Sequence, residues 1–200
     1  MPDRPLMPLW LRARAAHLLV PAGLGSLALL AVLLRDSTAM LPSLNLGAAE
    51  TVLMMYAPIP LAATLLLMLD SRLPGPEASG GRRIAVWDAG LVAAVMAAAV
   101  ALCALLGLLL DSDGVLSAAR NAPFLAGLAL CARPFAGQAA VMATVVWPVA
   151  VAMLGFHGRH DPYPWTVLPE PLGAPHAAAA SAVVFLLGLA ATARGPRSAS

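Results

Sequence analysis

Long apolar runs, separated by short polar segments, dominate the sequence. Six of them predict membrane-spanning helices, at residues 18–34, 48–69, 84–110, 115–132, 139–156 and 176–193. A spanning helix needs about 20 mostly apolar residues because the hydrocarbon core of a bilayer is about 30 Å thick. The pattern therefore predicts an all-α, polytopic transmembrane helix bundle of about six spans.

The fourth run is the weakest of the six because Arg120, Asn121 and Pro123 occupy its first turns. Without it, the chain would cross the membrane five times. The placement of arginine distinguishes the two counts, because short cytoplasmic loops are enriched in basic residues. With six spans and a cytoplasmic N-terminus, nine arginines lie inside and three lie outside, namely Arg35, Arg120 and Arg159. We therefore predict six spans with both termini cytoplasmic.

The composition agrees with a membrane protein. Of the 200 residues, 60% are hydrophobic and 11% are charged, whereas soluble proteins have about 25% charged residues. The spans leave only short loops, so a separate globular domain does not fit. Residues 1–17 are predicted to form a basic start at the membrane interface, residues 18–193 the transmembrane bundle, and residues 194–200 a cytoplasmic tail. The alternative that residues 1–17 are a plain basic flank that sets the orientation stays open. No small-residue cleavage motif follows the first run, so we expect that run to be retained.

The chain contains no lysine, which excludes a Walker A motif for ATP binding and a Schiff-base lysine. It also lacks the HExxH, GxSxG and CxxC patterns. We therefore predict no enzymatic activity and no cofactor, and an ATP-driven step would need a partner chain. The formal net charge of +2 reflects arginines that orient the chain, so no nucleic-acid partner is expected. Cys103 and Cys131 lie at different predicted depths and are expected to be unpaired.

Prolines interrupt two of the predicted spans. Pro58 and Pro60 lie near the middle of the second span, where they should leave the carbonyl groups of Met54 and Tyr56 without helical donors. Pro148 has the same effect in the fifth span. Broken helices near the membrane midplane often line a transport pathway, so these prolines and Tyr56 are pathway or hinge candidates. Proline is also tolerated in spanning helices for packing alone, and this alternative stays open.

Charged groups at membrane depth are rare and are candidates for function. Glu50, near the outer end of the second predicted span, could pair with Arg120 in the fourth. Asp88 lies one turn inside the third span, just beyond Arg82 and Arg83, and Arg133 on the same side is another possible partner. The alternative is that Glu50, Asp88 and Arg120 all reach the membrane interface and only stabilise helix packing.

The loop between the last two predicted spans is long and rich in proline. It contains or borders four hydrophilic side chains that could bind a metal: His157, His160, Asp161 and His176. Their spacing does not fix a ligand geometry, so we predict no metal site. Tyr163 and Trp165 are typical of anchors at the membrane–water interface.

The segment DSDGVLSAAR at residues 111–120 resembles the opening of the CDP-alcohol phosphatidyltransferase motif, D-x2-D-G-x2-A-R. However, Asp111 and Asp113 are separated by one residue instead of two, and Ala119 and Arg120 come too late. No further aspartate follows before Asp161. The acidic set that would hold a metal is incomplete, and we do not predict this activity.

A broader resemblance covers most of the chain. A basic amphipathic start, six spans, an inner loop after the second span and a structured outer loop before the last resemble the ABC-2 type permease fold. The segment RNAPFLAGLALCAR at residues 120–133, a WP pair in the fifth span, and PYPW before the last helix resemble small permease subunits of actinobacterial ABC exporters. The resemblance implies a multi-pass plasma-membrane protein that pairs with an ATP-binding cassette subunit.

In that family the inner loops transmit the motion of the ATP-binding subunit. The resemblance therefore makes the inner loop between the second and third spans the docking candidate, with Asp70, Arg72, Arg82 and Arg83 as its docking residues. The loop departs from the family in being short and rich in proline and glycine. A homodimer, or pairing with a second permease, is also expected.

The expected function is export of a hydrophobic or amphipathic cargo by alternating access, energised by a separate ATP-binding subunit. The small number of charges in the spans favours such a cargo over ions. A non-transporting immunity or scaffold protein of the membrane stays open as the alternative. It would need only small-residue packing of the kind found at Ala94, Ala98 and Gly107.

Overall fold

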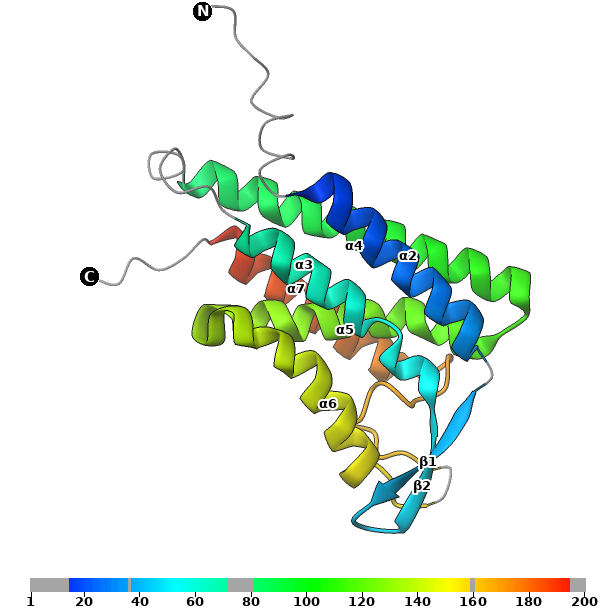
Figure 1. The fold of residues 1–200 in the computed structure, drawn as a ribbon. Coiled ribbons are helices and arrows are strands. Elements are labelled where there is room, and N and C mark those ends of the chain that lie inside the picture. The colour runs from blue at the N-terminus through cyan, green and yellow to red at the C-terminus, as the bar shows by residue number, and fades with distance from the viewer. Residues whose placement is uncertain (1–14, 36, 72–80, 159–160, 195–200) are drawn as a thin grey trace, which may run out of the picture.

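The computed structural model describes residues 15–35, 37–71, 81–158 and 161–194 (Figure 1). The described residues form six α-helices: α2 (Ala16–Leu34), α3 (Ile59–Asp70), α4 (Gly81–Leu110), α5 (Asp113–Ala136), α6 (Val141–Leu154) and α7 (Pro175–Ala193). Two 3-10 helices, η1 (Leu53–Tyr56) and η3 (Gly137–Ala140), and one antiparallel hairpin, β1 (Thr38–Ser43) with β2 (Gly47–Val52), complete this part of the chain. The protein is therefore mostly helical.

The helices form one bundle with two distinct ends (Figure 1). We call the end that carries β1 and β2 the hairpin end, and the other the opposite end. α2 begins and α7 ends at the opposite end, so the first and last described helices have their free termini on the same side. α6 starts beside the end of α5 and diverges from the rest of the bundle as it runs toward the hairpin end.

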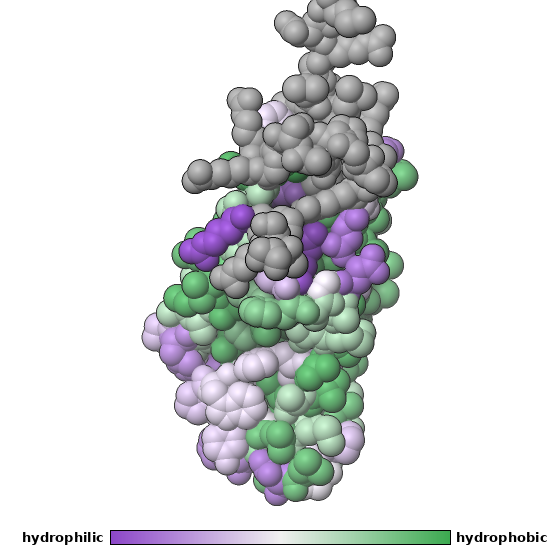
Figure 2. Space-filling model, turned by 90° about the vertical axis from the view of Figure 1, so that its left-hand side faces the viewer, coloured by the Kyte–Doolittle hydropathy of each residue, from purple (hydrophilic) through white to green (hydrophobic). Residues whose placement is uncertain are grey.

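The surface of the bundle is apolar. Leu108 and Leu109 of α4 are 74% and 71% exposed, and Leu33 of α2 is 62% exposed. Figure 2 shows hydrophobic residues over much of one face, with the most hydrophilic residues close to the grey segments. Extensive apolar patches of this kind are rare on soluble monomers. Among the described residues, five helical segments are long and apolar enough to cross a membrane: Ala16–Leu34, Leu53–Asp70, Ile84–Leu110, Asp113–Leu154 and Pro175–Ala193. These features are those of a membrane protein.

The structure has helix over five of the six predicted spans. The prediction for the remaining one, residues 48–69, is wrong in its first part, because residues 48–52 belong to β2 and the α-helix begins only at Ile59. The expectation of an all-α fold is corrected accordingly. The predicted interfacial start lies almost entirely in residues 1–14, which are outside the described residues, as does nearly all of the predicted tail.

Two prolines determine where α3 begins. Pro58 is its N-cap residue and Pro60 lies in its first turn, where a missing N–H removes no helical hydrogen bond. The residues before Pro58 therefore need other backbone partners, and β2 obtains them by pairing with β1 along its whole length. Gly47 has a positive φ of 74° at the turn between the strands, a conformation that glycine adopts readily. The prolines thus start a helix instead of kinking one.

The tip of the hairpin caps the end of α6. The last carbonyl groups of a helix lack helical donors, and the N–H of Leu44 donates to the carbonyl of Met153 at 2.9 Å. The Ser43 hydroxyl donates to the same carbonyl at 3.3 Å, and the Asn45 side-chain amide donates to the carbonyl of Leu154 at 3.4 Å. These bonds join the hairpin to α6, although the two segments are far apart in the sequence.

The chain turns back between α5 and α6. Helical residues run without interruption from Asp113 to Leu154, but Gly137 has φ 55° and ψ −128°, a conformation that a side chain disfavours. α5 and α6 point in different directions from this turn in Figure 1. They are therefore two helices, and each of the fourth and fifth predicted spans corresponds to one of them.

The DSDG segment, residues 111–114, lies at the start of α5. Ser112 is the N-cap residue, and its hydroxyl accepts the N–H of Val115 at 3.4 Å. Asp113 lies in the first turn, where a negative charge is favoured by the helix dipole. In this structure the residues of the phosphatidyltransferase-like segment form a helix start.

Glycine allows α5 and α7 to approach each other closely. A Cβ atom on Gly127 would lie 2.6 Å from the backbone nitrogen of Phe185, and one on Gly188 would lie 2.7 Å from the carbonyl oxygen of Gly127. Gly107 of α4 similarly packs against Leu116 of α5. Ala94 and Ala98, by contrast, lie on the exposed side of α4. Of the three small residues suggested by the sequence, only Gly107 therefore packs closely against another helix.

Replacing Gly127 by alanine should destabilise the bundle, because the new methyl group would overlap the backbone of α7. Overpacking of this kind costs about 1–3 kcal/mol. We expect the thermal-unfolding midpoint in detergent micelles to fall by several degrees. The matched control is Gly90→Ala in α4, because nothing lies within 4 Å of its added Cβ. Equal midpoints for the two variants would contradict the close packing of α5 on α7.

Candidate functional site

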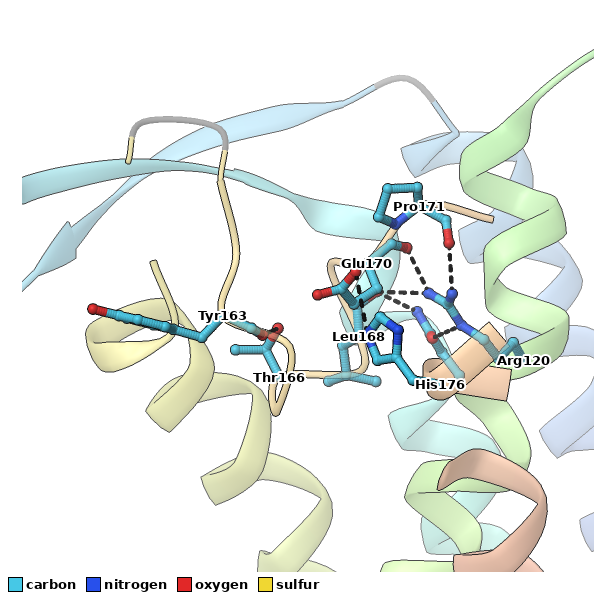
Figure 3. Close-up of polar contacts among 8 residues, drawn as sticks. Arg120, Tyr163, Thr166, Leu168, Glu170, Pro171 and His176 are labelled. Atoms are coloured by element: carbon cyan, nitrogen blue, oxygen red, sulfur yellow. Dashed lines mark hydrogen bonds and ion pairs between the residues drawn. The ribbon is translucent and has the colours of Figure 1, made fainter. Parts of the chain in front are cut away.

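Arg120, on α5, is the centre of a polar cluster at the hairpin end (Figure 3). Its Nη1 donates to the carbonyl of Pro171 at 2.8 Å. Its Nη2 donates to the carbonyls of Glu170 at 2.7 Å and Leu168 at 3.4 Å. The planar guanidinium suits such forked donation. Arg120 therefore holds the loop that connects α6 to α7 against α5.

Two neighbours complete this attachment. Asn121 is 2% exposed, its side-chain amide donates to the carbonyl of Leu168 at 3.1 Å, and its Oδ1 accepts Nε of Arg120 at 3.3 Å. The Ser181 hydroxyl, on α7, donates to the carbonyl of Arg120 at 2.6 Å. α5, the loop and the first turns of α7 are thus joined by hydrogen bonds at one place.

An acid and a histidine border the cluster. Nε2 of His176 lies 3.5 Å from Oε2 of Glu170, whose side chain is 10% exposed. Glu170 also interacts electrostatically with Arg120. The charged groups of the cluster are engaged with one another and with backbone carbonyls. The arrangement therefore acts as a clamp on the loop, which we call the Arg120 clamp.

A chain of aromatic rings lies beside the clamp. Trp147 of α6 packs against Phe124 of α5, with ring centroids 5.5 Å apart, and meets Trp165 edge-on at 6.1 Å. Tyr163 stacks with Trp165, with ring centroids 6.5 Å apart, and meets His157 at a tilt of 46° with centroids 4.9 Å apart. The aromatic rings fasten the same loop to α6, as the Arg120 clamp fastens it to α5.

Two buried polar atoms near α6 have no hydrogen-bond partner among the described residues. They are Nε1 of Trp147 and Oγ1 of Thr51. Trp147 packs against a small apolar cluster that includes Ala49, and Thr51 lies two residues further along β2, on the same face of the strand. A buried polar atom without a partner is uncommon and costly. Hydrogen bonding is therefore less complete where β2 meets α6 than in the clamp.

A second ionic contact lies at the opposite end. Nη2 of Arg133, near the end of α5, is 2.7 Å from Oδ1 of Asp70, the last residue of α3. The same guanidinium donates through Nε to that oxygen at 3.1 Å and through Nη2 to the carbonyl of Leu69 at 3.0 Å. The side chains of Asp70 and Arg133 are 17% and 18% exposed. α5 is therefore attached to another segment at each of its ends.

The proline candidates have different surroundings. Pro58 and Pro60 begin α3, as described above, and the N–H of Ala57 donates to the carbonyl of Met54 at 3.2 Å. That carbonyl is not left free, contrary to the prediction. Pro148 is buried within α6, which continues as helix on both sides of it. The half-buried Tyr56 packs against the apolar cluster that contains Met55 and Phe124.

The three residues predicted to carry charges within the membrane lie in different kinds of element. Glu50 lies on β2 instead of in a helix, which corrects its predicted placement, and the contacts described for Arg120 are those of the clamp. Asp88 is 1% exposed on α4. Arg133 pairs with Asp70 and does not take the role predicted for it beside Asp88.

The docking candidates can be located only in part. Asp70 is engaged with Arg133, while Arg72 lies outside the described residues. Arg82 and Arg83 are in the first turn of α4. Asp70 therefore links the start of the predicted docking loop to α5.

In the part of the chain that the structure describes, no group of three or more His, Cys, Asp or Glu side chains could hold a metal. His157 packs on Tyr163, His176 pairs with Glu170, and His160 lies outside the described residues. Cys103 is buried, Cys131 is half-buried, and both are free thiols, which confirms that they are unpaired.

The sequence pointed to Arg120 but not to its partners. Those partners are mainly backbone carbonyls, which have no residue-type signature, and the proline-rich segment at residues 169–171 is the only sign that they lack partners in a helix. Comparisons with protein-family models, curated proteins and solved structures find no match to this chain. What the protein does is therefore inferred from its own residues and contacts.

Replacing Arg120 by glutamine should release the loop between α6 and α7, because three carbonyl groups lose a charged donor. Hydrogen bonds to charged groups contribute about 1.5–3 kcal/mol. We expect faster amide hydrogen exchange in residues 166–174 and a lower unfolding midpoint in detergent, with Arg120→Lys intermediate because an ammonium cannot fork across the carbonyls. Arg133→Gln is the control, and it should leave exchange in residues 166–174 unchanged. Unchanged exchange in Arg120→Gln would refute the clamp.

The contact between Asp70 and Arg133 should appear as coupling in a double-mutant cycle. We expect Asp70→Asn and Arg133→Gln each to lower the unfolding midpoint, and the double variant to lose less than the sum. Directly paired residues typically couple by about 0.5–3 kcal/mol. The control cycle is Asp70→Asn with Arg120→Gln, which should be additive because the two residues lie at opposite ends of the bundle. Additivity at Asp70 and Arg133 would show that this pair contributes nothing.

Proposed function

We propose that the chain is a permease subunit of an ABC-type exporter in the plasma membrane, energised by a separate ATP-binding subunit. The observation that carries the proposal is the interruption of the second membrane segment. That segment, Leu53–Asp70, is the most buried of the five that could cross a membrane. It begins with a 3-10 turn, and its α-helix starts only after Pro58. Discontinuous helices inside a bundle are typical of transporters.

The short length of α3 supports this proposal. Its 12 residues span about 18 Å at the usual helical rise, whereas the hydrocarbon core is about 30 Å thick. The rest of the segment is a 3-10 helix followed by a two-residue turn. Non-helical backbone at membrane depth is tolerated where protein surrounds it or where it lines a cavity. Met54 and Met55 of η1 are buried, so this break is surrounded by protein and can serve as a hinge.

α5 offers a route by which motion could pass from one end to the other. Arg133 joins it to Asp70, next to the inner loop that is the docking candidate, and Arg120 joins it to the loop between α6 and α7. The two arginines are about 20 Å apart along the helix axis. We propose that an ATP-binding subunit displaces the inner loop and that α5 transmits the displacement to the clamp. ATP can drive this change only if it binds the two states differently.

The proposed orientation places the opposite end in the cytoplasm and counts α5 and α6 as separate crossings, giving six. Two observations support it: the first and last described helices have their free termini at one end, and the arginines gather on that side in the six-span reading of the sequence. The apolar helices favour a hydrophobic or amphipathic cargo. A homodimer, or pairing with a second permease, would provide the second half of a transport pathway.

The alternative is a non-transporting immunity or scaffold protein of the membrane. The close glycine contacts between α5 and α7 favour it, because helices packed this closely suit a rigid bundle. The two functions differ in whether the chain needs an ATP-binding partner, which can be measured directly.

Affinity purification of the full chain from its native membrane in mild detergent should recover an ATP-binding cassette protein together with vanadate-sensitive ATPase activity. We expect deletion of residues 72–80 to abolish the co-purification, because it removes most of the docking loop. Gly90→Ala, which alters an open position in α4, is the matched control and should keep both partner and activity.

Recovery of the chain without an ATPase would contradict the permease proposal and favour the alternative. A partner whose binding is unaffected by the deletion would contradict the docking role of the inner loop. If the partner binds, Asp70→Asn should retain it but lower ATP-dependent export of a fluorescent lipid from reconstituted vesicles.

A further inference from the structure

We infer that the tip of the hairpin, residues 44–46, inserts its apolar side chains into the lipid at the boundary between headgroups and acyl chains. The partner of this surface is thus the membrane itself, on the side of the hairpin end. The inference needs a bilayer but neither an ATP-binding subunit nor a cargo, so it is independent of the proposed function.

At the tip, apolar side chains face outward and polar side chains contact the protein, which is the reverse of what is expected for a turn in water. Leu44 is 70% exposed and Leu46 is 39% exposed. Asn45, between them, directs its amide to the carbonyl of Leu154, and Ser43 is buried with its hydroxyl toward Met153. The polar groups are engaged with the protein and the apolar groups face outward, which is the pattern of a lipid-facing surface.

Further exposed apolar side chains extend this surface along both strands. Met40 of β1 is 53% exposed, and Val52 of β2 is 42% exposed. In residues 38–52 the only charged side chain is that of Glu50, which is half-buried. Hairpins that meet water generally carry charges that keep their open edges from pairing with other chains. The scarcity of charge here favours contact with lipid.

The surface is continuous with the apolar side of α6. Val146 and Val149 are exposed along that helix, and Leu154 is exposed at its end. Leu44 follows directly, because its N–H is bonded to the carbonyl of Met153. α6 has 14 residues and spans about 21 Å, so it is shorter than the hydrocarbon core. The hairpin tip extends the apolar surface beyond the end of the helix.

Aromatic anchors set the depth of the tip. Tyr163 is bonded through its N–H to the carbonyl of Gly155, one residue after α6, and it stacks with Trp165. Both rings are partly exposed, and such tyrosine and tryptophan side chains favour the headgroup region. Asn45 contacts the carbonyl of Phe156 in the same stretch. The tip therefore lies at the level of these anchors.

The strand edges exclude a deeper position. A two-stranded hairpin has unpaired N–H and C=O groups on both outer edges, and such edges are not tolerated in the hydrocarbon core. At the headgroup boundary, water and lipid headgroups can pair with them while Leu44 and Leu46 reach the acyl chains. Insertion is thus confined to the side chains of the tip.

Site-specific fluorescence quenching tests this inference on the full chain. In a background with Cys103→Ala and Cys131→Ala, a single cysteine at Leu44 is labelled with an environment-sensitive dye and reconstituted into phosphatidylcholine–phosphatidylglycerol vesicles. Val146→Cys is the matched lipid reference, and Gly173→Cys, where an added Cβ meets nothing within 4 Å, is the matched aqueous reference.

We expect the dye at Leu44 to be quenched by lipids brominated near the glycerol end of the acyl chain, and to be several-fold less sensitive to aqueous iodide than the dye at Gly173. Sensitivity to iodide equal to that at Gly173, without lipid quenching, would overturn the inference. So would efficient disulfide cross-linking between Leu44→Cys chains with no lipid quenching, because a second copy would then cover the tip. Leu46→Cys repeats the test if the first variant fails to assemble.

Discussion

Backbone carbonyl groups that no helix satisfies determine how the hairpin end is built. In lipid or in the interior of a bundle, each such group needs a donor from the protein, because water is not available. Arg120 and Asn121 donate to the loop between α6 and α7, and Leu44 and Asn45 donate to the end of α6. The polar groups named here are therefore turned toward the backbone, while Leu44 and Leu46 are exposed on the outside.

α5 unites the two ends of the molecule. It lies close to α7 through Gly127, it carries the Arg120 clamp at the hairpin end, and it holds Asp70 through Arg133 at the opposite end. α5 is helical from Asp113 to Ala136 although it contains Pro123 and Pro134, and in the proposed mechanism a displacement of one contact passes along it to the other. α3 is short and begins with two prolines, so it is the segment best able to change its position relative to α5. This contrast of a continuous helix with a broken one underlies the proposed permease.

The sequence predicts most helices because their apolar runs are long and are bounded by polar residues. It fails at residues 48–52, where the apolar run continues from strand to helix without a change in composition, and this error also placed Glu50 on a helix facing Arg120. The interruption at Pro58 is predicted within a helix, whereas in the structure Pro58 is the N-cap residue of α3. Arg120 was singled out by its position, yet its carbonyl partners could not be named, because any residue type supplies a carbonyl.

The oriented arrangement of the helices is the central claim, and it is tested most directly by the sidedness of two exposed positions. In a background with Cys103→Ala and Cys131→Ala, Gln138→Cys lies at the turn between α5 and α6, and Gly173→Cys lies just before α7. With six crossings and cytoplasmic termini, a membrane-impermeant thiol reagent added to intact cells should label the cysteine at Gly173 at once, and the one at Gln138 only after permeabilisation. Labelling of both from the same side would contradict separate crossings by α5 and α6.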